Sequence, residues 1–381
     1  MMASPARRIL MTTDAVGGVW TYATELVRGL CERGDDVTLI VMGPAPRAEQ
    51  LAPLHGIPRL RIELTDLSLE WMDPDGSDIA NARERLVSIA QRVRPAIIHL
   101  NSYREAIFDW PAPVLVVAHS CVWSWWQACR GGDPDDPRWH RYQEAAAAGL
   151  ATADMWCAPS EAFGHTIEAL YPVRTPGCVI RNGARIQATS HEKKPLILAA
   201  GRLWDEAKNL STLAAIASDL DWPVQVAGPL SVPGSDESCS ETFNLTCLGH
   251  LSRPELTAQM QRASIFAAPA LYEPFGLSVL EAAACGCALA LSDIPSLREL
   301  WQGAALFVAA GDRDAWRNAL QRLARDHGLR MQLQRAALMR ARRYSLDTMV
   351  DAYREVYRAM ANHVLDHVAP ARRPMTEGAP A

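Results

Sequence analysis

The most informative stretch of the chain is ALYEPFGLSVLEAAACG at 270–286, which carries two glutamates eight residues apart. Glu273 follows the apolar run 264–270, and a Pro-Phe-Gly turn separates it from a helix that we expect to begin near Leu277. Glu281 then lies about one turn inside that helix. Carboxylates accept hydrogen bonds from hydroxyl groups, and the unpaired amides of a helix N-terminus bind phosphates. The stretch therefore suits a sugar that lies next to a diphosphate.

Two basic residues leave the end of another apolar run. The run 196–201 leads into GRLWDEAKNL, which places Arg202 and Lys208 six residues apart before a helix expected near Asn209. Arginine can bind a phosphate through two N–H groups and lysine acts as a point charge, so the pair suits a diphosphate. A solvated surface pair explains the spacing equally well.

Two glycines mark a further turn. Gly17 and Gly18 follow the apolar run 9–13 and precede a segment, 20–34, whose apolar residues have helical spacing. Glycines at this point let backbone amides approach a ligand closely. The pattern is not G-x-G-x-x-G, so it indicates a dinucleotide only weakly, and a plain strand-to-helix turn is the commoner explanation.

Aromatic residues gather after the apolar run 113–119. His119 ends the run, and Trp123, Trp125 and Trp126 follow within seven residues. Indole rings stack on the C–H faces of sugars or on apolar groups, so these tryptophans could bind an acceptor. Burial between domains explains them equally well. For His119, the residues alone favour a hydrogen-bonded histidine at a strand end.

Alternating apolar runs and helical patterns would position these residues. The runs are continuously apolar, as parallel strands covered on both faces must be. Ligands bind beyond the carboxyl ends of such strands, and the residues singled out above follow directly after runs. The runs are 9–13, 37–42, 96–100, 113–119 and 155–159 in the first half, and 196–201, 224–228, 264–270, 288–292 and 305–309 in the second.

The polar segment 187–194 separates the two halves. We therefore expect an N-terminal domain over 1–186 and a C-terminal domain over 187–349. A helix at about 350–368 is expected to pack back on the first domain. The small, polar and Pro-containing end of the chain, 369–381, is expected to be disordered.

Composition excludes several classes of protein. The 381 residues exceed one ordinary core, and 49% apolar with 21% charged residues excludes a mostly disordered chain. A net charge of −5 argues against a duplex-binding protein. No run reaches the roughly 18 apolar residues of a spanning helix. Nine cysteines without a Cys-x-x-Cys pair favour a reduced, cytoplasmic location, and Asp133-Pro134-Asp135 is interpreted as a turn instead of a metal motif.

Together the motifs resemble a retaining glycosyltransferase of family 4, a GT-B class that uses nucleotide-sugar donors. The resemblance rests on GGVWTYATEL, PSE after the run 155–159, VIRNG, GRL…KN and E-x7-E, and it covers nearly the whole chain. It implies two Rossmann-like α/β domains whose parallel sheets face a central cleft. Two departures stand out. SDIPSLREL replaces the usual Gly-Gly before the late glutamate, which puts Glu299 in a less flexible loop, and Ala184 and Arg185 follow the hinge asparagine-glycine, where aspartate is frequent.

The resemblance also implies roles for matched residues. Glu273 would contact hydroxyls of the donor sugar and Glu281 would hold the ribose. Arg202 and Lys208 would bind the diphosphate, and His119 would lie near the reacting sugar. Further donor contacts would come from Gly17, Gly18, Phe275, Gly276, Leu277 and Glu299, and acceptor contacts from Trp123, Trp125 and Trp126.

The sequence thus predicts retaining, metal-independent transfer of a hexose from a nucleotide-diphosphate sugar, with UDP favoured over GDP. The acceptor would be a hydroxyl of a glycan, a lipid-linked molecule or a small molecule. We expect no cofactor, no metal and no nucleic-acid partner, and peripheral contact with a membrane stays open, as does the oligomeric state. The alternatives are a nucleotide-sugar epimerase of the same fold and a silent sugar-nucleotide-binding protein.

Overall fold

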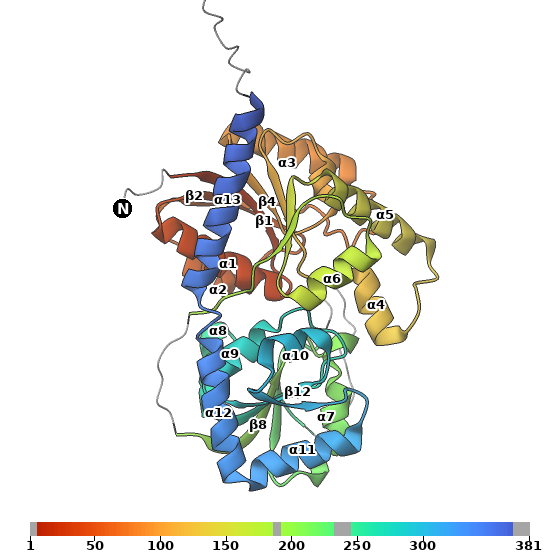
Figure 1. Cartoon of the computed structure of the whole chain (residues 1–381), viewed down its shortest axis with the longest axis vertical. Coiled ribbons are helices and arrows are strands. Elements are labelled where there is room, and N and C mark those ends of the chain that lie inside the picture. Colours follow the sequence, from red (N-terminus) through yellow and green to blue (C-terminus); the bar gives the residue numbers. More distant parts are fainter. Residues whose placement is uncertain (1–5, 186–191, 232–244, 369–381) are drawn as a thin grey trace, which may run out of the picture.

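The computed structural model shows two α/β domains, one above the other along the long axis of the molecule (Figure 1). It describes residues 6–185, 192–231 and 245–368. The end of the chain predicted to be disordered, 369–381, lies outside the described residues, as does most of the polar segment 187–194.

The N-terminal domain is built around one parallel sheet. Within the described residues, its seven strands follow the order β3-β2-β1-β4-β5-β6-β7. The inner strands β1, β4 and β5 are largely buried, which explains why β5 is continuously apolar and why β1 and β4 are mostly so. The strands are β1 (Arg8–Asp14), β2 (Asp36–Met42), β3 (Leu60–Leu64), β4 (Ile97–Leu100), β5 (Val114–Val117), β6 (Met155–Ala158) and β7 (Gly177–Val179).

Helices cover both faces of this sheet. On one face Leu10 of β1 packs in a cluster with Leu86 and Leu150, while its neighbour Ile9 packs on the other face with Leu26. This alternation is what the pleat of a strand requires. The helices are α1 (Gly18–Glu32), α2 (Ala48–Leu51), α3 (Ile79–Val93), α4 (Val122–Arg130), α5 (Pro137–Thr152) and α6 (Glu161–Leu170), with short 3-10 turns η1 (Ala52–Leu54) and η2 (Arg104–Ile107).

The C-terminal domain repeats this plan with a second parallel sheet. Its strands follow the order β10-β9-β8-β11-β12-β13 in the described part of the chain. They are β8 (Lys194–Ala200), β9 (Val224–Ala227), β10 (Thr246–Gly249), β11 (Ala263–Ala268), β12 (Ala288–Ser292) and β13 (Ala305–Val308). The helices are α7 (Leu210–Ile216), α8 (Arg253–Arg262), α9 (Leu277–Ala284), α10 (Pro295–Trp301), α11 (Arg313–Arg325) and α12 (His327–Ala341), with η3 (Glu206–Lys208) and η4 (Ala217–Asp219).

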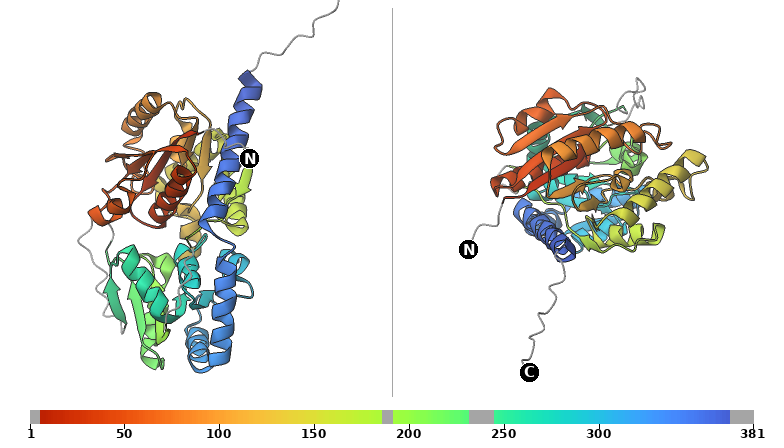
Figure 2. Two further views of the ribbon diagram at one scale, coloured as in Figure 1. Left: turned by 90° about the vertical axis from the view of Figure 1, so that its left-hand side faces the viewer. Right: turned by 90° about the horizontal axis from the view of Figure 1, so that it is seen from above.

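The last helix, α13 (Leu346–Val368), leaves the C-terminal domain and runs along the N-terminal domain, as the two views in Figure 2 show. Met349, Val350 and Tyr353 are buried in the same cluster as residues of α1. Arg354 Nε lies 3.0 Å from the buried carboxylate of Asp35. The N-terminal core therefore depends on the C-terminal end of the described chain.

The chain crosses between the domains at two places that lie side by side. The N–H of Ala184 donates to the carbonyl of Tyr344 at 3.1 Å, and the N–H of Leu346 donates back to the carbonyl of Ala184 at 3.0 Å. A Cβ atom on Gly183 would lie only 2.4 Å from the carbonyl oxygen of Ser345. Glycine is therefore required for the close approach of the two crossings.

Candidate functional site

The candidate site lies where the segments that follow the strands of both sheets meet at the domain boundary. Ser160, after β6, donates its hydroxyl to the carbonyl of Pro274 at 2.7 Å. The N–H of Cys121, after β5, donates to the hydroxyl of Tyr272 at 3.0 Å. Because ligands of parallel sheets bind beyond the carboxyl ends of strands, this boundary is where the predicted residues should gather.

Arg202, two residues after β8, lies against the glycine turn that follows β1. A Cβ atom on Gly17 would lie 2.9 Å from Arg202 Nη1, so the absence of a side chain lets the guanidinium approach the backbone. Nε and Nη2 of Arg202 both donate to the carboxylate of Asp205, Nε at 3.2 Å. Burial raises the pKa of Asp205, but the nearby charges of Arg202 and Lys208 outweigh it and lower the pKa. Asp205 is therefore ionised, and its carboxylate holds the guanidinium of Arg202 in place.

Lys208 and Glu273 come from different strand ends and form an ion pair of 2.6 Å between Nζ and Oε2. Both side chains are mostly buried, with 22% and 16% of their surface exposed. Asn209, in the left-handed region with φ 49°, anchors this loop by donating Nδ2 to the carbonyls of Pro269 and Ala310 at 2.9 and 3.1 Å. A cation and a carboxylate are thereby fixed at one point of the boundary.

The N-terminus of α9 faces the N-terminus of α1 across the boundary. Gly276 has φ 86°, a conformation that favours glycine, and α9 begins at the next residue. Leu277 Cδ1 lies 3.7 Å from the position of a Cβ atom on Gly18. Phe275 is buried beneath this turn, and Glu273 Cγ lies 3.4 Å from the position of a Cβ on Gly276. The N-terminus of α9 therefore adjoins the lysine–glutamate pair, and the N-terminus of α1 lies beside it, an arrangement that favours an anion.

Glu281 lies in the second turn of α9 and faces a charged residue of α8. Arg253 Nη2 is 3.4 Å from its Oε1, and Nη1 of the same guanidinium pairs with Glu25 of α1. Burial raises the pKa of Glu281, and Arg253 opposes this effect. The arginine thus bridges carboxylates from the two domains.

His119 follows β5 and is partly buried at the same boundary. Its Nε2 lies 2.8 Å from Oδ1 of Asn101, and its ring meets the ring of Tyr22 in an edge-on contact with 4.3 Å between centroids. Burial lowers the pKa of His119 to about 3, with a smaller contribution from His99. The imidazole is therefore neutral at neutral pH.

The three tryptophans of α4 have different surroundings. Trp123 is 4% exposed, packs in the N-terminal core and donates its Nε1–H to Asp133 at 3.0 Å, so it is a core residue. Its burial disagrees with the predicted acceptor contact, because the core covers its ring. Trp125 donates its Nε1–H to Asp205 of the other domain at 3.0 Å. Trp126 is partly exposed and stacks under the guanidinium of Arg130, 4.4 Å from the ring centroid.

Glu299 lies on a helix, so its predicted place in a loop was wrong. Pro295 occupies the first position of α10, where proline favours helix formation. The carboxylate of Glu299 accepts hydrogen bonds from the N–H groups of Glu161 and Ala162 at 3.1 and 2.8 Å, and it pairs with Arg181 at 2.9 Å. It caps the N-terminus of α6 across the domain boundary.

The described residues contain no group of three or more His, Cys, Asp or Glu side chains arranged to hold a metal ion. Asp133 of the Asp-Pro-Asp sequence instead accepts hydrogen bonds from Trp123 and from Gln127 Nε2 at 2.9 Å. In the same part of the chain, no helix has the length and apolar character needed to cross a membrane.

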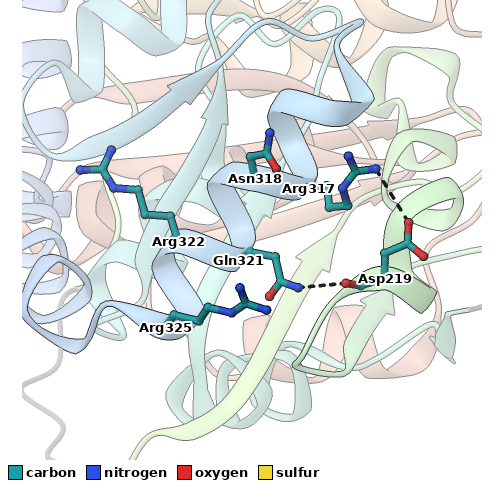
Figure 3. A pocket seen from close by; sticks show the side chains of 6 residues that line it. All are labelled: Asp219, Arg317, Asn318, Gln321, Arg322 and Arg325. Carbon is teal, nitrogen blue, oxygen red and sulfur yellow. Dashed lines mark hydrogen bonds and ion pairs between the residues drawn. The ribbon is translucent and has the colours of Figure 1, made fainter.

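A surface hollow on α11 is distant from this site, at the end of the C-terminal domain that faces away from the other domain (Figures 1 and 3). Within it, Arg317 lies 3.9 Å from Asp219, and Gln321 Nε2 donates to the carbonyl of Asp219 at 2.9 Å. The hollow is lined by Asp219, Arg317, Asn318, Gln321, Arg322 and Arg325.

Comparison with known families assigns both halves of the chain. Residues 16–187 match the family described as Glycosyltransferase Family 4, and residues 181–340 match the family described as Glycosyl transferases group 1. Together the two matches cover residues 16–340, which include most of both domains. The chain belongs to the family 4 glycosyltransferases.

Curated relatives of this glycosyltransferase include two D-inositol 3-phosphate glycosyltransferases. That of Pseudarthrobacter chlorophenolicus is 30% identical over 129 residues, which are 33% of this chain and 31% of the relative. That of Stackebrandtia nassauensis is 26% identical over 217 residues, which are 55% and 43% of the two chains. The matched segments thus span less than half the length of these relatives.

Solved structures show that the glycosyltransferase has the GT-B fold. Sucrose-phosphate synthase from Thermosynechococcus elongatus aligns with a TM-score of 0.78 and 18% identity, over 94% of this chain and 100% of its own. Anabaena Alr3699/HepE in complex with UDP and glucose aligns with a TM-score of 0.74 and 16% identity, over 93% and 100%. The expected class of two parallel-sheet α/β domains is confirmed.

The structure brings most of the predicted site residues of the glycosyltransferase to one boundary, together with residues that the sequence analysis missed. Asp205 holds Arg202, and Asn101 holds His119. Arg253 pairs with Glu281. Asp205 lies between Arg202 and Lys208 in the sequence, so it could have been predicted from its position there. Asn101 directly follows β4, so its position after a strand could have identified it.

Buried His99 makes the stability of the glycosyltransferase depend on pH. Burial lowers its pKa from 6.5 to about 3. Between these values the unfolded chain binds a proton that the folded chain does not, so the free energy of unfolding falls as the pH falls, by up to about 1.4 kcal/mol per pH unit. We expect His99→Gln to make this dependence shallower in urea unfolding at a series of pH values. His165→Gln, at an exposed position, is the control, and equal slopes in wild type and His99→Gln would contradict the prediction.

Proposed function

We propose that this glycosyltransferase moves a hexose from a nucleotide-diphosphate sugar, UDP-linked in preference to GDP-linked, to an acceptor hydroxyl, with retention of configuration and without a metal. The observation that carries the proposal is the meeting of Arg202, Lys208 and the N-terminus of α9 at the domain boundary. Two cations and free amides at one place fit a diphosphate, and Glu273 beside them fits sugar hydroxyls.

The same groups supply a chemical reason for transfer. Breaking the bond between sugar and diphosphate develops negative charge on the leaving oxygen, and preorganised cations and amides stabilise this charge. The acceptor hydroxyl would attack the face that the diphosphate leaves. This route needs no pair of catalytic carboxylates like that of retaining glycosidases.

The names of known relatives support the proposed donor and the proposed classes of acceptor. Anabaena Alr3699/HepE has been solved with UDP-glucose, which supports a UDP-linked donor here. A Campylobacter jejuni relative, 29% identical over 182 residues, is named as an N-acetylgalactosaminyltransferase of a diphospho-undecaprenol compound, and others are named for D-inositol 3-phosphate. We therefore propose either a lipid-linked or a small hydroxylated acceptor.

Release of nucleotide tests this proposal. Purified protein is incubated with UDP-glucose or GDP-mannose, with and without EDTA and with candidate acceptors. We expect UDP release and a glycosylated acceptor, unchanged by EDTA because the described site uses side-chain cations. Loss of turnover with EDTA would contradict the metal-independent mechanism. A free or epimerised sugar that forms equally without acceptor would favour the epimerase alternative.

A further inference from the structure

The orientation of the Asn101 side chain is fixed by its neighbour on β1. Its backbone N–H donates to Thr12 Oγ1 at 3.1 Å, and its side-chain nitrogen lies 2.7 Å from the carbonyl oxygen of Thr12. A carbonyl oxygen can only accept, so the atom at this distance has to be the NH₂ group. The amide oxygen of Asn101 therefore faces His119.

This orientation fixes the proton on His119. The amide oxygen of Asn101 lies 2.8 Å from His119 Nε2 and has no hydrogen to give, so Nε2 carries the proton. In a neutral imidazole the other nitrogen, Nδ1, then has a free lone pair. The low pKa of His119 agrees with a neutral ring.

A second histidine uses the same amide oxygen. His99 Nε2 lies 3.2 Å from Oδ1 of Asn101, and His99 Nδ1 lies 2.6 Å from the hydroxyl of Tyr357. An amide oxygen has two lone pairs and can accept from both rings. The hydroxyl of Tyr22 also lies 3.2 Å from Nε2 of His99, so this nitrogen can share its hydrogen between Asn101 and Tyr22 while Tyr357 donates to Nδ1. Hydrogen on Nε2 of both rings therefore satisfies all of these contacts.

We propose that Asn101 is a positioning residue that holds His119 as the neutral tautomer with hydrogen on Nε2, so that Nδ1 accepts a hydrogen bond from a hydroxyl of the transferred sugar. The inference rests on the proposed function and deepens it. His119 is partly exposed at the boundary where the proposed diphosphate-binding side chains lie, and its ring packs edge-on against the ring of Tyr22. A neutral acceptor nitrogen selects a hydroxyl over a carboxylate or a phosphate oxygen.

Nuclear magnetic resonance of the ligand-free chain tests the tautomer directly. In protein labelled with ¹⁵N-histidine, the His119 signals are assigned by their loss in His119→Gln. We expect a pyrrole-type shift for Nε2 and a pyridine-type shift for Nδ1 in the wild type at pH 7. Asn101→Asp should move His119 toward the imidazolium form, because a carboxylate beside the ring stabilises its charge. A pyridine-type Nε2 in the wild type would overturn the inference.

Kinetics with UDP-glucose separate positioning from a merely structural role. We expect Asn101→Asp to lower kcat/KM at least about 10-fold, since a protonated Nδ1 cannot accept, while the Kd for UDP stays within about twofold. In a His119→Ala background Asn101→Asp should cost nothing further, and an additive loss would overturn the inference. Asn101→Ser replaces the aspartate variant if circular dichroism shows that the latter is unfolded.

Failure of the inference is distinguishable from failure of the proposed function. A wild type that turns over UDP-glucose but carries hydrogen on Nδ1 overturns the role of Asn101 alone. A wild type with the expected tautomer that binds no UDP overturns the proposed function, and the sugar contact with it.

Discussion

Replacing Arg202 with alanine is expected to lower kcat for UDP release from UDP-glucose by roughly 10²–10³-fold, the usual cost of removing one preorganised donor from a developing negative charge. Arg202 Nη1 lies against the glycine turn of the N-terminal domain, and Asp205 holds the rest of the guanidinium. KM should change far less than kcat, because the charge on the leaving oxygen grows in the transition state.

Arg325→Ala is the matched control for this prediction. Arg325 also pairs with an aspartate, Asp221, at 2.7 Å, but it lines the hollow on α11 and not the domain boundary. We expect its kcat to equal that of the wild type. Arg202→Lys should recover only part of the lost rate, since an ammonium lacks the planar fork that both Asp205 and a phosphate can use. A kcat for Arg202→Ala within threefold of the wild-type value would contradict the proposed contact of Arg202 with the diphosphate.

Gly149→Ala is expected to destabilise the N-terminal domain by about 3 kcal/mol or to prevent its folding. A Cβ atom at this position in α5 would lie 1.9 Å from the carbonyl oxygen of Tyr103. The obstacle is backbone that leads into η2, so it cannot turn aside as a side chain could. Urea unfolding followed by tryptophan fluorescence measures the loss.

Gly164→Ala gives the comparison for this second prediction. Gly164 is also a buried glycine within a helix, α6, but the nearest atoms to its Cβ position are side-chain carbons at 3.8 and 3.9 Å. Alanine has room there and favours helix, so we expect wild-type stability or a gain of up to about 1 kcal/mol. Equal stability of the two variants would show that α5 and η2 can separate at no cost.

The interior strands of both sheets could be predicted from the sequence, whereas three strands at sheet edges could not. β5 and all but the last residue of β12 are continuously apolar because helices cover both of their faces. β3, β7 and β10 lie at edges and retain exposed residues, so their sequences resemble those of loops. Their pairing depends on the neighbouring strand more than on their own side chains.

The positions of the site residues after strands were predictable, but their partners were not. Lys208 and Glu273 each follow a strand, yet only the folded chain places their charges 2.6 Å apart. The sequence left open whether Trp123 is buried, and the packing of α4 decides it. The loop predicted around Glu299 was wrong because Pro295, within the segment that replaces the usual Gly-Gly, starts a helix there.

The hydrogen-bonded pair of crossings restricts how the domains can move. Because Ala184 is bonded to Tyr344 on one side and Leu346 on the other, the two connections cannot bend independently. A rotation of the domains that keeps both hydrogen bonds has to pivot close to this pair, because Ala184, Tyr344 and Leu346 then move as one unit. Such a pivot would return the groups on either side of the boundary to the same register each time the domains close.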